Sequence, residues 1–311
     1  MSALLQRLAD PDAEVRRIAL LDLQYSDEDD FVPLAVAALG DADGGVRAEA
    51  ARVLEGYEEG EVLAALVPLL RDPDARAREA AAATLAELKE SASGDHLLPM
   101  LADRDPFVLA MSFRALRELR RAEAYEAALG ALGHPEACVR REAVGVLGYL
   151  RKPAAVPRLA EIAARDADAE VRRISVGALG YSTDISVLPS LVRALQDSSW
   201  QVREEAAATV GKIGIAAGSP ELVRALGDDY WQVALKAARS LGRLKGRDAV
   251  EPLIAMLGHK ISNLRKEVVI ALGELADPRA IVPLEGMLQD ADPDVRKLTR
   301  LALASIQAKA A

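Results

Sequence analysis

Three histidines and one cysteine are the side chains best suited to metal or nucleophilic chemistry: His96, His134, His259 and Cys138. A metal site needs several such ligands converging on one point. His134 and His259 occupy equivalent positions four repeats apart in the pattern described below, so they cannot meet, and His96 stands alone. We therefore expect no metal site.

Cys138 follows His134 by four residues, a spacing that would place both side chains on one helical face, but a turn separates them. It precedes an expected helix whose dipole would activate a thiol. The pattern favours a tolerated small residue, with a reactive thiol as the alternative. Neither a Walker-type phosphate loop nor a nucleophile elbow is present, so we assign no catalytic residue.

The charged residues instead recur at a fixed interval. The segment "DPDAEVRRIALLDL" (10–23) returns as "DADPDVRKLTRLAL" (290–303). When the valine of "EVR" is taken as an anchor, steps of 31 residues, with one of 32, connect ten positions: Val15, Val46, Ala77, Val108, Val139, Val171, Val202, Val233, Leu264 and Val295. Ten copies in register predict a single solenoid over residues 1–311.

An acidic turn and an arginine flank most anchors. Five residues before the anchor lies aspartate, except at His134 and His259, and arginine follows the anchor except at Leu109 and Ala234. Aspartate can cap the first amides of a helix, where negative charge is favoured. We expect each arginine to pair with turn aspartates of its own or the neighbouring repeat. These residues predict an architectural ladder and not a catalytic row.

Each repeat is expected to contain two helices joined by a tight turn. In the fifth repeat, apolar residues of 122–132 recur at helical spacing, "GHPEA" forms the turn, and a second apolar stripe follows: Val139, Ala143, Val146, Leu147 and Leu150. Apolar residues make up 51% of the chain but aromatic residues only 4%, which suits closely packed helices. The sequence predicts an all-α fold of about twenty helices without a sheet.

Composition excludes several classes of protein. The net charge of −9 disfavours nucleic-acid binding, which depends on phosphate neutralisation. A single cysteine rules out an intrachain disulfide framework and fits a reducing compartment. The beginning of the chain lacks the pattern of a signal peptide. The sequence contains no run of about 20 apolar residues, so we expect no membrane span. We expect a soluble, cytoplasmic protein.

The period, the acidic turn, the Val-Arg pair and the "ALG" near the end of the second helix resemble HEAT repeats. More narrowly, "DADAEVRRISVGALG" (166–180) and "DSSWQVREEAAATVGKIG" (197–214) resemble the phycobilisome (PBS) lyase HEAT-like repeat. The resemblance covers essentially the whole chain. It implies a right-handed superhelix, an α-solenoid whose second helices line the concave face. It leaves function open, because such repeats occur in scaffolds, maturation factors and a few enzymes.

Two enzyme classes with HEAT-type repeats are disfavoured. The di-iron hydroxylases that modify a translation factor use repeated His-Glu pairs, and this sequence has no His-Glu dipeptide. The alkylated-DNA glycosylases need a basic groove over most of their length, whereas charges alternate in sign along these helices. If the chain is an enzyme at all, a bilin-lyase-like activity is the remaining alternative.

Positions two, three, six and ten residues after the anchor should face the concave side. The two middle repeats share "RREAVGVLGY" (140–149) and "RRISVGALGY" (172–181), which pair Arg141 with Arg173, Gly145 with Gly177, and Tyr149 with Tyr181. Glycine inside a helix costs about 1 kcal/mol relative to alanine. Gly145 and Gly177 would therefore form a glycine floor, a surface without side chains that would admit a flat ring, an anionic group or a partner helix. The alternative is a recent duplication with glycine placed for close packing.

Tryptophan gives a second signal. Trp200 and Trp231 occupy the same turn position in consecutive repeats, which predicts indoles about 10 Å apart on one rim. Tryptophan is enriched at binding hot spots, although each indole could instead pack on the neighbouring repeat. Arg239, with Lys236 and Arg243, extends a partly basic groove.

The two halves of the chain differ, and so do its ends. The first four repeats lack the "LG" pair, and the one step of 32 residues follows the fifth anchor. These differences predict a change of curvature near 151–165, between a divergent N-terminal half and a more regular C-terminal half. Apolar residues occupy inner positions of the terminal repeats: Ile18, Leu21, Leu298 and Leu301. A homodimer through these repeats is one expectation.

Together these patterns predict a non-enzymatic scaffold or adaptor that binds a protein partner in the concave groove, without a cofactor. The alternative is a bilin-lyase-like or cofactor-maturation chaperone that holds a tetrapyrrole or an apo-protein in the central groove. The candidate binding residues are Arg141, Gly145, Tyr149, Arg173, Gly177, Tyr181, Trp200, Trp231 and Arg239.

Overall fold

The computed structural model describes residues 3–23, 25, 31–182 and 184–310. Over these residues the regular structure consists of nineteen α-helices and eleven short 3-10 helices, with no strand. The all-α solenoid expected from the repeat pattern is confirmed. None of the described helices is long and apolar enough to cross a membrane.

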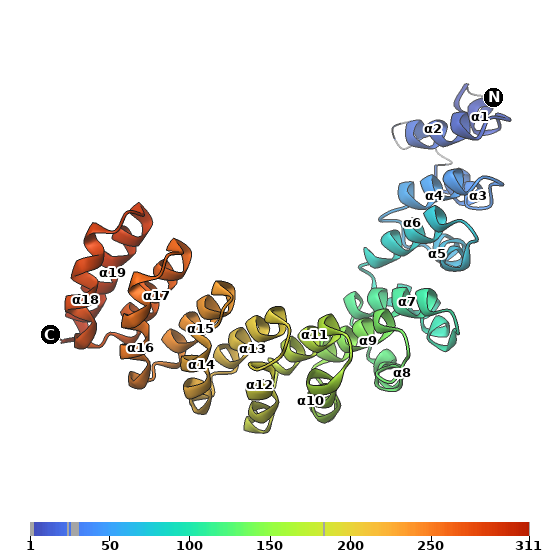
Figure 1. Cartoon of the computed structure of the whole chain (residues 1–311). Coiled ribbons are helices and arrows are strands. Elements are labelled where there is room, and N and C mark those ends of the chain that lie inside the picture. The colour runs from blue at the N-terminus through green and yellow to red at the C-terminus, as the bar shows by residue number, and fades with distance from the viewer. Residues whose placement is uncertain (1–2, 24, 26–30, 183, 311) are drawn as a thin grey trace. The chain divides into compact units, whose positions relative to one another are not determined.

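The chain forms two compact units, residues 1–150 and 151–311. In each unit the second helices of the repeats form one row and the first helices form another (Figure 1). The change of curvature predicted near residues 151–165 stays a prediction.

Unit 1 contains five repeats. The second helices are α2 (Ala13–Leu23), α4 (Gly44–Val53), α6 (Ala75–Ala86), α7 (Pro106–Glu118) and α9 (Ala137–Leu150). The first helices are α1 (Ala3–Leu8), α3 (Phe31–Ala38), α5 (Gly60–Leu66) and α8 (Tyr125–Ala131). The first segment of the fourth repeat forms two 3-10 helices, Ser91–His96 and Leu98–Ala102, because its serines, Gly94 and Pro99 are poor formers of an α-helix.

Unit 2 contains the other five repeats. Its second helices are α11 (Ala169–Leu179), α13 (Trp200–Ile213), α15 (Trp231–Leu244), α17 (Ser262–Leu275) and α19 (Pro293–Ala310). Its first helices are α10 (Val156–Arg165), α12 (Leu188–Ala194), α14 (Ser219–Ala225), α16 (Val250–Ala255) and α18 (Ile281–Gly286).

The core lies between the two rows of helices. In unit 2 the anchors are fully buried, as are four leucines of the first helices: Leu191, Leu222, Leu253 and Leu284. Each fully buried Val or Leu contributes roughly 1.5–3 kcal/mol relative to its exposed state. The 31-residue period is therefore the spacing at which equivalent apolar residues return to the core.

The glycine of the "LG" and "VG" pairs allows neighbouring second helices to approach closely. A Cβ atom at Gly211 would lie 2.2 Å from Ser240 Oγ, and one at Gly273 would lie 3.0 Å from Ala302 Cα. Both distances are shorter than a side chain tolerates without movement of the next helix. In these repeats the glycine is a packing requirement.

Candidate functional site

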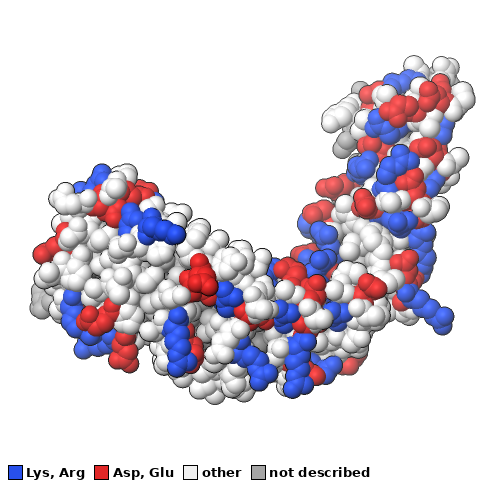
Figure 2. All heavy atoms as spheres, viewed as in Figure 1, with Lys and Arg blue, Asp and Glu red and all other residues white. Residues whose placement is uncertain are grey.

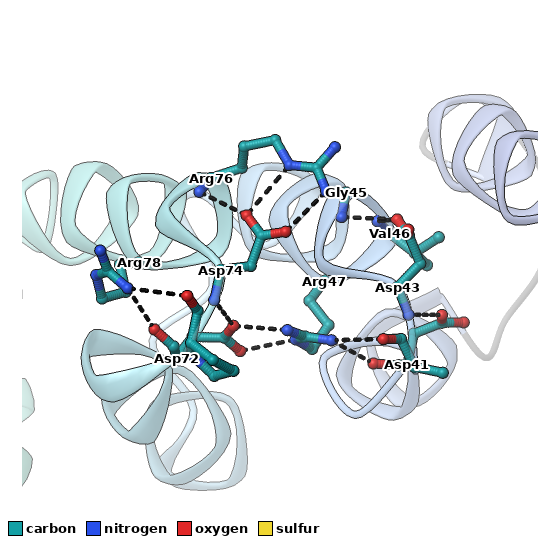
Figure 3. Close-up of polar contacts among 11 residues, drawn as sticks. Asp41, Asp43, Gly45, Val46, Arg47, Asp72, Asp74, Arg76 and Arg78 are labelled. Atoms are coloured by element: carbon teal, nitrogen blue, oxygen red, sulfur yellow. Dashed lines mark hydrogen bonds and ion pairs between the residues drawn. The ribbon is translucent and has the colours of Figure 1, made fainter.

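The turns of the repeats are connected by an arginine ladder. Arg47 Nε and Nη2 donate to Asp72 Oδ2 and Oδ1 at 2.7 and 2.6 Å, and its Nη1 donates to the carbonyl of Asp41 at 2.8 Å (Figure 3). This bidentate geometry is the stronger form of a charged hydrogen bond. It recurs along the chain at Arg16–Asp41, Arg47–Asp72, Arg172–Asp197, Arg203–Asp228 and Arg265–Asp290.

Each rung also affects its own turn. Asp72 Oδ1 accepts the backbone N–H of Asp74, and Asp43 Oδ1 accepts the N–H groups of Gly45 and Val46 at the beginning of α4. The hydrogen bonds from Arg47 hold the pKa of Asp72 below its usual value. The predictions of helix capping and of pairing with a neighbouring repeat are both confirmed.

Two rungs are replaced in a correlated way. Leu109 and Ala234 take the place of the arginine, and the residue 25 positions later is His134 or His259 in place of aspartate. The histidines keep the local turn, because Nδ1 of His134 accepts the N–H of Glu136 and Nδ1 of His259 accepts that of Ile261, both at 3.1 Å. The ladder carboxylate is thus absent where its arginine is absent.

In unit 1, the inner face of α9 is covered by a neighbouring side chain. A Cβ atom at Gly145 would lie 3.0 Å from Arg117 Nη1, so the guanidinium of Arg117 fills the space above the glycine. Glu142, which is buried, pairs with both Arg117 at 3.2 Å and Arg141 at 3.3 Å. Glu142, three residues after the anchor, is therefore buried, although the sequence pattern places this position on the exposed concave side.

Tyr149, at the end of α9, is 39% exposed. The guanidinium carbon of Arg120 lies 5.4 Å from the centre of the Tyr149 ring, within the range of a cation–π contact. The ring is therefore accessible but already has one cationic neighbour.

In unit 2, the equivalent residues of α11 have similar surroundings. A Cβ atom at Gly177 would lie 3.0 Å from Glu205 Oε1. Arg173 donates to Glu170 at 2.7 Å and approaches Glu205 at 3.4 Å. In each unit a long side chain from the neighbouring repeat lies over the glycine, Arg117 over Gly145 and Glu205 over Gly177. A role for these glycines in binding stays a prediction.

Tyr181 lies between two cations. Its ring centre is 4.2 Å from the Arg151 guanidinium carbon and 3.9 Å from Lys212 Nζ. The ring is 43% exposed. A partner would therefore meet an aromatic edge flanked by positive charge.

The tryptophans lie at the turns. Trp200 stacks on Tyr230 of the next repeat, with ring centres 5.3 Å apart and planes inclined by 9°, and the Arg203 guanidinium lies 5.7 Å from the Tyr230 ring. Trp231 begins α15 at the equivalent position and is half-buried. For Trp200 the structure shows the expected alternative, packing on the neighbouring repeat. A role for either indole in partner binding stays a prediction.

The basic groove predicted around Arg239 is largely neutralised. Arg239 donates through Nε and Nη2 to Glu267 at 2.8 and 2.6 Å, and Lys236 lies 3.8 Å from Glu204. Arg239 and Lys236 therefore form ion pairs between neighbouring second helices. Over the described residues, no group of three or more His, Cys, Asp or Glu side chains is placed to hold a metal ion.

Residues of varied type mark the opposite end of the second helices in unit 2. We define the inner edge as the residues six and ten positions after each anchor of this unit: Gly177, Tyr181, Ala208, Lys212, Arg239, Arg243, Ile270, Glu274, Leu301 and Ser305. In the view of Figure 2, the surface over α13, α15 and α17 is predominantly uncharged, whereas charges of both signs mark the first helices α12 and α14.

Paired helices, a buried valine anchor and a turn ladder define an α-solenoid of short helical repeats. The model of HEAT repeats matches residues 1–86, 32–117, 94–180, 157–233 and 219–304. The chain therefore belongs to the HEAT-repeat family.

Several solved structures share this fold. An engineered protein is 21% identical with a TM-score of 0.53, covering 98% of each chain. The E. coli protein YibA is 19% identical with a TM-score of 0.54, covering 93% of this chain and 95% of its own. Kap95p, in its structure with RanGDP, is 14% identical with a TM-score of 0.68; 97% of this chain matches 49% of that one. A search of curated protein sequences found no significant match.

Proposed function

We propose that this chain is a non-enzymatic scaffold that binds a protein partner along the inner edge of unit 2. One observation carries the proposal: the turn ends of the second helices repeat the same residues, whereas the inner edge changes at each repeat. Tyr181, Lys212, Arg243 and Leu301 are all exposed there. Structural demands favour the same residue in each repeat, and recognition of a partner favours different ones.

Similarity to proteins with the same fold supports the proposal. Kap95p, which shares the solenoid fold over the matched region, binds RanGDP. Within the family, the 31-residue unit and its "ALG" sequence favour the phycobilisome-lyase type of repeat. The tetrapyrrole alternative stays a prediction, and Arg117 and Glu205 lie over the two glycines that suggested it.

Site-specific photo-crosslinking tests the scaffold function. Benzoylphenylalanine replaces Tyr181 on the inner edge in one variant and Val282, which is 76% exposed on α18, in the control. We expect a defined protein adduct from position 181 in native cells that is absent from position 282. The purified partner should then bind the unmodified chain, and an excess of the unmodified chain should suppress the adduct at position 181 by competition.

Identical adducts from both positions would contradict the proposal, because the inner edge would then be no more selective than the outer surface. Absorbance titration with a bilin serves as the second arm. A saturable spectral shift there would favour cofactor maturation over a protein scaffold.

A further inference from the structure

A hollow of about 650 Å³ lies among α15, α17 and α19 in unit 2. Its volume is within the range of about 300–1,000 Å³ that is usual for binding pockets. We call it the C-terminal hollow and define it by an apolar floor and a charged rim: Ile270, Leu298, Leu301 and Ala302 form the floor, and Arg243, Lys245, Glu274 and Lys309 form the rim.

The floor is closed by close packing of α17 and α19. A Cβ atom at Gly273 would lie 3.0 Å from Ala302, so the helices touch there. Ser305 Oγ donates to the Gly273 carbonyl at 3.1 Å, which satisfies the polar groups beside this contact. Above it, Leu301 is 60% exposed. Covering this leucine would remove apolar surface from water, which is favourable.

The rim differs from four other cationic positions on the second helices of unit 2. Arg173, Lys236, Arg239 and Lys266 each pair with a carboxylate. Over the described residues, by contrast, Arg243, Lys245 and Lys309 form no ion pair, and all three are exposed.

The cap of α15 fixes the backbone of one of the rim residues. Lys245 follows α15 in the left-handed conformation, with φ of 55°, and its N–H donates to the carbonyls of Gly242 and Leu241. Lys245 therefore keeps its position beside the hollow through the cap of the helix. The rim contains three cations and one carboxylate, that of Glu274. Its charge is therefore positive, although the net charge of the chain is −9.

We propose that the C-terminal hollow binds an acidic amphipathic helix of a partner protein. Apolar side chains at positions i, i+3 or i+4, and i+7 of that helix would cover Leu301 and its neighbours, and the flanking carboxylates would meet the rim cations. The proposal rests on the scaffold function above and names the chemistry of the partner. Because the chain as a whole repels acidic segments, the positive rim supplies selectivity for this one place.

Three fluorescein-labelled peptides of about 18 residues, long enough to form helix on binding, test the charge and the shape separately. The first carries leucine at helical spacing and glutamate elsewhere. The second has lysine in place of each glutamate, and the third has the composition of the first in a scrambled order. We expect saturable anisotropy with the first peptide on the intact chain, and affinities at least about tenfold weaker for the other two.

Variants locate the binding. The double variant Lys245→Glu with Lys309→Glu should lower the affinity for the acidic peptide at least about tenfold. It should also make that affinity less dependent on salt concentration. Leu301→Ser should weaken it similarly at all salt concentrations, because it removes apolar contact and leaves the charges unchanged. The matched control is Lys260→Glu with Arg300→Glu, two exposed residues that do not line the hollow, and it should bind like the parent.

Several results would overturn the proposal: equal affinity for the acidic and basic peptides, no saturable binding of any of the three, or loss with the control variant equal to that with the rim variant. Sedimentation that shows a dimer dissociated by Leu301→Ser would make a second copy the occupant. A specific adduct at Tyr181 together with any of these results would leave the scaffold function standing and remove only this site.

Discussion

The two ends of the second helices in unit 2 have different requirements. On α13, Arg203 at the turn end holds Asp228 of the next repeat through Nε and Nη2 at 2.6 and 2.9 Å. Lys212 at the inner end is exposed and contacts only the ring of Tyr181 among the described interactions. The first residue type recurs at the same position in most repeats, and the second does not.

The difference indicates how a repeat protein can vary its binding surface without losing its fold. At the turn end, a carboxylate must cap a helix and an arginine must hold that carboxylate, so the residues are fixed as a pair. At the inner end the contacts differ from repeat to repeat: Arg239 pairs with Glu267, whereas Lys212 meets only the ring of Tyr181. Changes at unpaired positions such as Lys212 should alter recognition with little effect on stability.

The largest expected effect is the loss of the whole ladder in acid. Hydrogen bonds from arginine lower the pKa of Asp41, Asp72 and Asp290. At Asp197 and Asp228 burial acts to raise the pKa, but the bonds from arginine and from the backbone outweigh it, so the pKa is again lowered.

A carboxyl group with a lowered pKa in the folded state stabilises the fold at pH values above its unfolded pKa, which is about 3.9 for aspartate. This contribution is lost as the pH falls through the folded pKa. The free energy of unfolding should therefore be level from neutral pH to about pH 5 and fall steeply below about pH 4. Urea unfolding at a series of pH values checks this, and equal stability at pH 3 and pH 7 would show that the ladder does not stabilise the fold.

A single rung should contribute less. Arg203→Ala should lower the free energy of unfolding by about 1–3 kcal/mol, because Asp228 loses two charged hydrogen bonds in a partly buried site. Arg243→Ala, at the exposed inner edge, should change it by no more than about 0.5 kcal/mol. Equal losses in the two variants, measured by urea denaturation, would abolish the distinction between the two ends.

Restoring a missing rung should have the smallest effect. Ala234→Arg together with His259→Asp should rebuild the pair between α15 and the next turn. We expect a favourable coupling of about 1 kcal/mol in a double-mutant cycle, because each single change introduces a charge without its partner. A coupling of zero would mean that the rebuilt pair does not stabilise the connection between α15 and the next turn.

Much of the fold could be predicted from the sequence because the repeat forces equivalent residues into equivalent environments. The anchors from Val46 to Val295 are buried as the period predicts. The ladder was predictable in type, since an aspartate and an arginine recur together. The link between Ala234 and His259 was also visible as a 25-residue spacing, but it requires comparison of neighbouring repeats and not inspection of one.

The candidate site was harder to predict. Whether a glycine opens a space depends on the side-chain conformation of a residue in another repeat, as Arg117 above Gly145 shows. The C-terminal hollow depends on three successive helices and on the capping conformation of Lys245. Its leucines, Leu298 and Leu301, gave a signal in the sequence as apolar residues at inner positions of a terminal repeat, and Arg243 gave one as part of the predicted basic groove.

The most direct test compares two variants of one helix, Arg203→Ala and Lys212→Glu on α13, in two measurements made on the same samples. One is the free energy of unfolding in urea, and the other is the affinity for the partner captured at Tyr181. We predict that Arg203→Ala lowers stability and leaves the affinity unchanged, while Lys212→Glu lowers the affinity and leaves stability within about 0.5 kcal/mol. The reverse pattern, with affinity lost at Arg203 and stability lost at Lys212, would contradict the assignment of structure to the turn end and recognition to the inner edge.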